Sequence, residues 1–170
     1  MSRARFCALL VGCLAASSCS RPKAKSPGVN FGPISIAPTS GYGREQIFRV
    51  TLSSPDRPML VGLLINDDPD GANACYVFHS FTTNEELLVN DNGSGSKPLG
   101  NAPALANAQC SIIKDGSTAS ITNNKIAVSF HIRFKETFRG TKTLYTVAVS
   151  SAGGTQGPAN AGTWDMWDAR

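Results

Sequence analysis

The amino-acid sequence predicts an all-β sandwich of about nine or ten short strands. In residues 125–134 (KIAVSFHIRF) apolar side chains occupy every second position, which is the period of a half-buried strand. Segments rich in Gly, Pro, Asn and Asp recur at short intervals and predict turns. We find no convincing amphipathic helix. Many short strands separated by turns favour a sandwich over a barrel.

The clearest pattern lies in Lys125–Ser150. Lys125–Phe134 alternates cleanly, and Tyr145, Val147 and Val149 repeat the alternation in the second half. The polar segment Lys135–Gly140 joins the two halves. Two long strands joined in this way are expected to form the central pair of the domain.

The remaining elements follow from the same signals. The other expected strands are Pro33–Pro38, Gln46–Ser53, Met59–Asn66, the hairpin of Ala74–Phe81 and Glu85–Asn90, Gln109–Ile113, Thr118–Thr122 and Gly162–Met166. The expected turns and loops are Thr39–Arg44, Ser54–Pro58, Asp67–Asn73, Asp91–Ala108 and Ser151–Ala161. The strand Met59–Asn66 (MLVGLLIN) is apolar on both faces, which predicts that the outer face of its sheet is also covered.

The N-terminus carries a targeting signal. A basic start and a short apolar run, too short to cross a bilayer, predict a secretion signal within Met1–Ser20. Cys19 follows small residues in the manner of a bacterial lipoprotein signal, so we expect lipidation there; Cys13 is the alternative site. Simple cleavage of the signal is the other outcome. The predicted organisation is a signal over 1–19, a flexible basic linker over 20–30, and one β-sandwich over 31–168.

The balance of charges limits the classes of partner that the sequence predicts. The formal net charge is +4, but Arg3 and Arg5 lie in the signal, so residues 21–170 carry 14 basic and 12 acidic side chains. So small a net charge predicts no affinity for nucleic acid and no membrane contact beyond a lipid anchor.

The chain resembles an uncharacterised immunoglobulin-like module that recurs in secreted bacterial proteins. The resemblance rests on the order and spacing of GANACY, AQC and GTW between Ser35 and Trp164. It implies an exported immunoglobulin-like sandwich with a paired Cys75 and Cys110, and it supplies no catalytic residues. Independently, an even pair of cysteines in an exported chain favours a disulfide over two free thiols or a metal site.

One segment partly matches a calcium-binding loop. Residues 66–71 (NDDPDG) place Asp67, Asp68 and Asp70 before a glycine, but Asn66 stands at the first position and Val77 where a bidentate Glu belongs. We expect an acidic connection between strands here, with a weak Ca²⁺ site as the alternative and no other cofactor.

No catalytic motif is recognisable. His131 falls on the polar face of its strand and is expected to be solvated, whereas His79 is expected to be partly buried and hydrogen-bonded. The sequence lacks G-x-S-x-G, H-E-x-x-H and a phosphate-binding glycine loop. We therefore expect a protein that is not an enzyme.

The expected function is interaction or spacing in the bacterial cell envelope. The partner is an envelope protein or a polysaccharide, bound by loops at one end of the sandwich, with Asp91–Ala108 and Ser151–Ala161 as the candidates. Trp164 is expected in the core. Exposed aromatics, Trp167 and Tyr42 first, support carbohydrate binding as the alternative.

Overall fold

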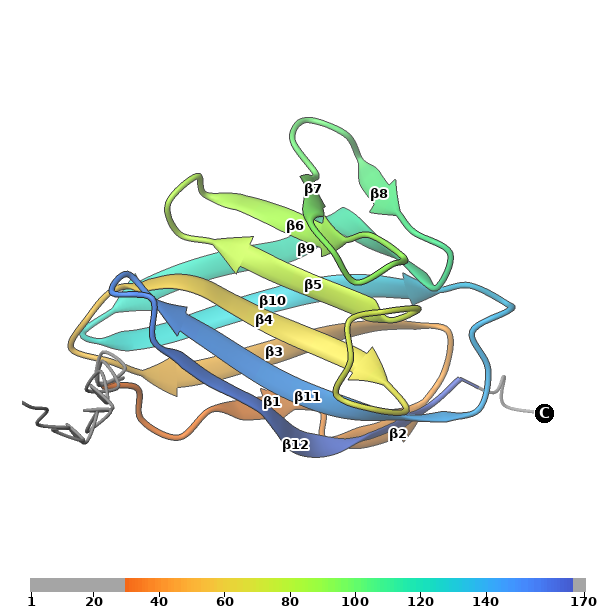
Figure 1. Cartoon of the computed structure of the whole chain (residues 1–170), viewed down its shortest axis with the longest axis horizontal. Helices are drawn as coiled ribbons and strands as arrows, with labels where there is room; N and C mark the ends of the chain where they lie inside the picture. Colours follow the sequence, from red (N-terminus) through yellow and green to blue (C-terminus); the bar gives the residue numbers. More distant parts are fainter. Residues whose placement is uncertain (1–29, 167–170) are drawn as a thin grey trace, which may run out of the picture.

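The protein is an immunoglobulin-like antiparallel β-sandwich. A computed structural model describes residues 30–166, and within this range it contains twelve strands and no helix, hence none that could cross a membrane. One sheet has five strands in the order β1-β3-β10-β9-β8, and the other has seven in the order β2-β12-β11-β4-β5-β6-β7. The two sheets face one another along the whole domain (Figure 1).

The strands of the five-stranded sheet are β1 (Ser35–Ala37), β3 (Glu45–Ser53), β8 (Ala104–Ala106), β9 (Cys110–Thr122) and β10 (Lys125–Phe134). Those of the seven-stranded sheet are β2 (Ser40–Tyr42), β4 (Pro58–Asn66), β5 (Cys75–Ser80), β6 (Glu85–Val89), β7 (Ser96–Pro98), β11 (Thr141–Ser150) and β12 (Thr155–Asp165). All pairings are antiparallel except that of β2 with β12.

The strand order matches the variable-type immunoglobulin topology. There, strands A, B, E and D form one sheet, and G, F, C, C′ and C″ form the other. Here β1, β3, β10 and β9 take the first set of places, and β12, β11, β4, β5 and β6 take the second. The disulfide differs from that of antibody domains, because Cys75 and Cys110 join β5 to β9 rather than strands B and F.

The core lies between the sheets and follows the alternation seen in the sequence. Ile126, Val128, Phe130 and Ile132 of β10 point inward and are 0–1% exposed. They meet the inward residues Val61, Leu63 and Ile65 of β4 within one hydrophobic cluster. Trp164 is in this core as predicted; its ring packs edge-on against Phe48 with ring centroids 5.1 Å apart.

Several predictions about individual elements were wrong. The two strands of the expected central pair do not pair with each other, because β10 lies in the five-stranded sheet and β11 in the seven-stranded sheet. The two short strands expected at 109–113 and 118–122 form one strand, β9, whose register against β10 shifts near Gly116. The predicted turn Thr39–Arg44 contains β2, the loop Asp91–Ala108 contains β7 and β8, and the loop Ser151–Ala161 ends where β12 begins at Thr155.

Candidate functional site

The outer face of the seven-stranded sheet is apolar across four neighbouring strands. The register places Tyr145, Leu64 and Tyr76 in one row across β11, β4 and β5. The next row crosses β11, β4, β5 and β6 through Val147, Gly62, Phe78 and Leu87. Val149 and Leu60 follow in a third row, and Val89 also faces outward from β6. We call these ten positions the outer apolar face.

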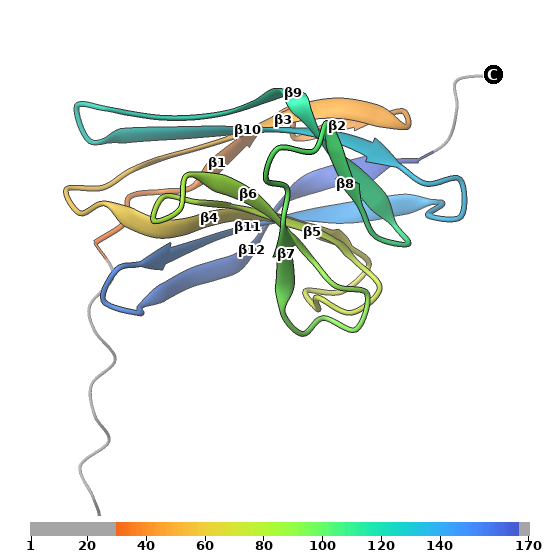
Figure 2. The same cartoon turned by 90° about the horizontal axis from the view of Figure 1, so that it is seen from above.

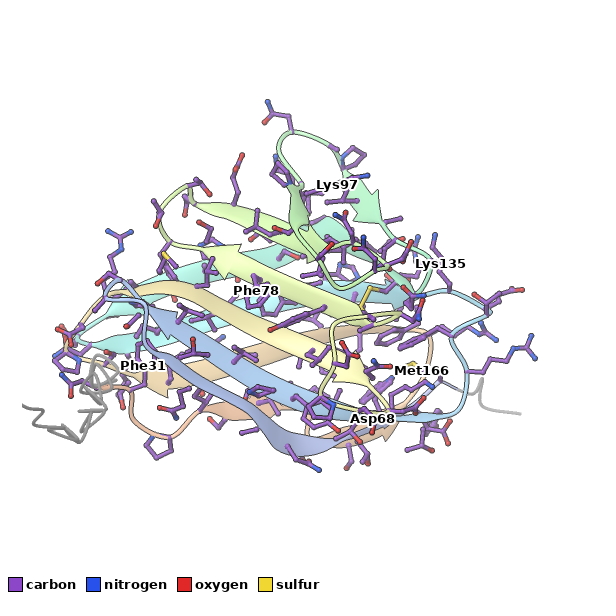
Figure 3. The ribbon with its side chains drawn as sticks, viewed as in Figure 1. Phe31, Asp68, Phe78, Lys97, Lys135 and Met166 are labelled. Carbon is purple, nitrogen blue, oxygen red and sulfur yellow. A yellow bond between two sulfur atoms is a disulfide. The ribbon has the colours of Figure 1, made fainter. Side chains whose placement is uncertain are left out.

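Aromatic rings lie over this face. The rings of Phe78 and Tyr76 are 4.4 Å apart and tilted at 45°. Phe78 covers Gly62, where an added Cβ would stand only 2.4 Å from the ring. Leu64, which stands between Tyr145 and Tyr76 in the register, is only 1% exposed although it points away from the core. Figure 3 shows Phe78 on the front of the sheet.

One connection covers only the end of the outer apolar face. The β4–β5 connection, residues 67–74, curls over the sheet where β4 ends (Figure 1). The Tyr145 hydroxyl donates to the main-chain oxygen of Asp67 at 3.2 Å, and the Tyr76 ring lies against Gly71. Burial raises the pKa of Tyr76 to about 12. The prediction that the outer side of Met59–Asn66 is covered therefore holds at this end, while Phe78, Leu60 and Leu87 are only half-buried.

The same connection contains the acidic residues of the partial calcium motif. The Asp67 carboxylate pairs with the Lys142 ammonium at 2.7 Å, and the Asp70 carboxylate accepts the main-chain N–H of Ala72 at 3.0 Å. Asp68 is exposed, and Figure 3 labels it at this end of the sandwich. Within residues 30–166, no three His, Cys, Asp or Glu side chains are grouped to hold a metal. The weak Ca²⁺ site stays a prediction.

His79 is buried between the sheets, deeper than predicted. It is 3% exposed, and its Nδ1 lies 3.2 Å from Glu86 Oε1, while its Nε2 is buried without a hydrogen-bond partner. The hydrogen bond from His79 lowers the pKa of Glu86 below its usual value, against the opposing effect of burial.

His131 was predicted to be solvated, but both of its ring nitrogens have hydrogen-bond partners within the protein. Its Nε2 lies 2.8 Å from Glu45 Oε1, and its Nδ1 lies 2.5 Å from the main-chain oxygen of Asp115. Arg133 Nε donates to the second oxygen of Glu45 at 2.7 Å. The bonds from Arg133 and then His131 lower the pKa of Glu45. This cluster lies on the outer face of the five-stranded sheet.

The predicted disulfide is present. Cys75 and Cys110 are bonded at 2.05 Å, and both are fully buried. The bond links the two sheets beside the edge formed by β6, β7 and β8.

The other predicted site residues are not brought together. Tyr42, on β2, is 64% exposed and makes no ring contact with another aromatic side chain of the described chain. Trp167 and the candidate lipidation sites Cys13 and Cys19 lie outside the described residues.

The two predicted binding loops lie at opposite ends of the sandwich, so they cannot form one site. The pairing of Pro58 with Ser150 puts residues 151–154 at one end. The segment 90–95 follows the far end of β6, near the end of β4. Within 91–108 the chain passes from β7 of the seven-stranded sheet to β8 of the five-stranded sheet (Figure 2). A groove of about 430 Å³ is lined by residues of β6, β7 and β8.

Asn107 is a key residue that the sequence reasoning missed. Its side-chain nitrogen donates to the main-chain oxygens of Ala74 and Val89, at 2.9 and 3.2 Å. Its side-chain oxygen accepts the N–H groups of Gln109 and Cys110, both at 2.9 Å. This single side-chain amide therefore hydrogen-bonds to main-chain groups of both sheets next to the disulfide. An Asn in a Gly- and Asn-rich loop carries no sequence signal of such a role.

Comparison of the chain with protein-family models, with curated proteins and with solved structures found no match.

Proposed function

We propose that this protein is a non-enzymatic, exported interaction module of the bacterial cell envelope that binds a protein partner through the outer apolar face. The observation that carries the proposal is the row-by-row apolar surface on β11, β4, β5 and β6, which no other layer of the described chain covers along its length. Four of its ten positions are buried by their neighbours, and the other six, among them Phe78, Leu60 and Leu87, stay partly exposed. Contiguous exposed apolar surface often marks an interaction site.

The chemistry of the face favours a protein over a sugar. Sugar sites combine an exposed ring with convergent polar groups, whereas the neighbours of Phe78 here are Gly62, Leu87 and the Tyr76 ring. A central aromatic anchor within an apolar patch is typical of protein interfaces. Exposed Tyr42 is the one described observation that favours the carbohydrate alternative.

Export is supported by the disulfide, because such bonds persist in oxidising compartments. We propose that lipid at Cys19 anchors the module, with residues 20–29 as the tether. The described chain starts at the end where Asn30 bonds to Asp56, in the β3–β4 turn. The outer apolar face would then run along the flank of the anchored domain, open to partners in the same envelope.

The binding proposal is tested by photocrosslinking in intact cells of the native source. A photoreactive residue replaces Phe78, and the matched control replaces Ile47, which is 43% exposed on the outer face of the other sheet. We expect one discrete protein adduct from position 78 and none from position 47. Polysaccharide adducts would support the carbohydrate alternative instead. Absence of any adduct at 78 would leave a spacer as the function.

Anchoring is tested separately with Cys19→Ala and, as the matched control, Cys13→Ala. We expect Cys19→Ala alone to abolish incorporation of a clickable fatty acid and to move the protein from the membrane to the soluble fraction. Loss of labelling in Cys13→Ala alone would assign the lipid to the other cysteine. Equal behaviour of both variants and the parent would contradict lipidation.

A further inference from the structure

We propose that the free edge of β8 binds an extended peptide segment of a partner protein, which adds one strand to the five-stranded sheet. This site is distinct from the outer apolar face and does not depend on it. β8 is an edge strand that pairs on one side only, with β9.

The hydrogen-bond pattern identifies the unpaired main-chain groups. Lys114 N–H donates to Pro103 and Asn107 N–H donates to Cys110, at 2.9 and 3.0 Å. In an antiparallel ladder, hydrogen-bonded pairs alternate with pairs whose groups point away. Leu105 therefore bonds to β9, and the N–H and C=O groups of Ala104 and Ala106 point to the free edge. Both alanines are exposed.

Two of the other three sheet edges carry features that discourage pairing. Prolines flank β1, at positions 33 and 38. On β7 the same alternation points Ser96 and Pro98 outward, and Pro98 has no N–H to donate. β8 has no charge within its three residues, and small side chains flank its free groups. Pro103 precedes β8, but it is paired with Lys114, so its nitrogen faces β9 and the free edge loses no donor. Such an edge is a ready template for another strand.

A groove runs beside this edge, between β8 and the β6–β7 pair. Its volume is about 430 Å³. Leu105 and Leu88 line it from the two sheets, and Asp91, Asn92 and Lys97 supply polar groups. An added strand would place alternate side chains toward the groove and toward solvent. The groove therefore fits an extended segment with apolar side chains on one face and uncharged polar side chains on the other.

The surroundings of the groove favour one strand over a second copy of the protein. β6, β7 and residues 90–92 bound the groove opposite β8. A second copy would bring its β9 along with its β8, because the two are paired. The second copy would therefore bring two strands about 4.8 Å apart to this bounded edge, whereas a partner's extended segment brings only one.

The test uses the full mature chain, oxidised and ¹⁵N-labelled, with the probe N-acetyl-Thr-Val-Thr-Leu-Thr-Val-Thr-amide. Two derivatives of the probe carry N-methyl groups, one on its four Thr residues and the other on its two Val residues and its Leu residue. Each methylation pattern removes the donors from one edge of the extended peptide. We expect the parent probe to shift the amide signals of Ala104 and Ala106 and to slow their hydrogen exchange. We expect one methylated derivative to bind at least about tenfold more weakly and the other to bind like the parent.

A protein variant tests the same contact from the other side. Ala106→Pro removes an outward N–H without removing a bond to β9, and Ala106→Thr is the matched control that keeps the donor. We expect about tenfold weaker binding for the proline variant only. If the proline variant does not fold, the methylated probes still decide. The proposal is overturned if millimolar probe leaves both alanine signals unmoved, or if both methylated derivatives bind like the parent. It is also overturned if the signals shift with protein concentration alone, which would assign the edge to a second copy.

Discussion

Removal of the Cys75–Cys110 disulfide should cost this domain several kcal/mol of stability. The bond joins residues 35 positions apart, and the chain-entropy model gives about 4 kcal/mol for a loop of that length. For a domain of this size, we expect a fall of roughly 10–15 °C in the midpoint of thermal unfolding. The closed loop contains β6, β7 and β8, together with the groove beside them.

The measurement is thermal unfolding followed by circular dichroism at neutral pH. The samples are the parent protein and the double variant Cys75→Ala/Cys110→Ala, which leaves no free thiol from the pair, each with and without reductant. Reductant should lower the parent to the level of the double variant and should not affect the variant. Hydrogen exchange in 85–106 should rise more on reduction than exchange in β3 and β10. Equal midpoints for the parent and the double variant would refute the stabilising role of the bond.

Three further predictions follow from the described contacts. Asn107→Ala should cost roughly 2–4 kcal/mol in chemical denaturation, because it leaves buried main-chain groups unpaired, and Asn107→Asp, which keeps the shape but loses the donor, should not restore the loss. Gly62→Val should displace the Phe78 ring and cost about 1–3 kcal/mol, read from the denaturation midpoint; an unchanged midpoint would contradict the close packing. The lowered pKa of Glu86 stabilises the fold above the pKa of an unfolded Glu, and this stabilisation is lost as pH falls through the lower folded value. The midpoint of Glu86→Gln should therefore fall less than that of the parent between about pH 6 and pH 3, and parallel curves would show that the bond with His79 contributes nothing.

The sequence was a good guide to local structure and a poor guide to strand partners. Alternation in Lys125–Phe134 identified a strand and its buried face, because side chains of a strand alternate between two environments. It did not identify the sheet. A polar connection such as 135–140 can form a hairpin or cross from one sheet to the other, and here it crosses. The choice depends on contacts with distant strands that no local pattern records.

Short edge strands were missed for a related reason. β2, β7 and β8 have three residues each, and they contain Gly, Ser, Pro and Ala, which are typical of loops. Their strand geometry comes from main-chain bonds to a longer neighbour. β12 was recognised only from Gly162 onward, because its first half contains Gly, Pro and Asn, has no apolar alternation, and is largely exposed.

The strand β4 departs from the alternation that is expected when only one face of a strand is buried. A strand with one buried face should alternate, yet Leu60 and Leu64 are apolar on the side away from the core. Leu64 is 1% exposed, so it serves a small apolar cluster on the outer side of the sheet. Leu60 and Phe78 belong to the same face and stay partly exposed. Apolar side chains that stay partly exposed outside the core support the proposal that this face binds a partner.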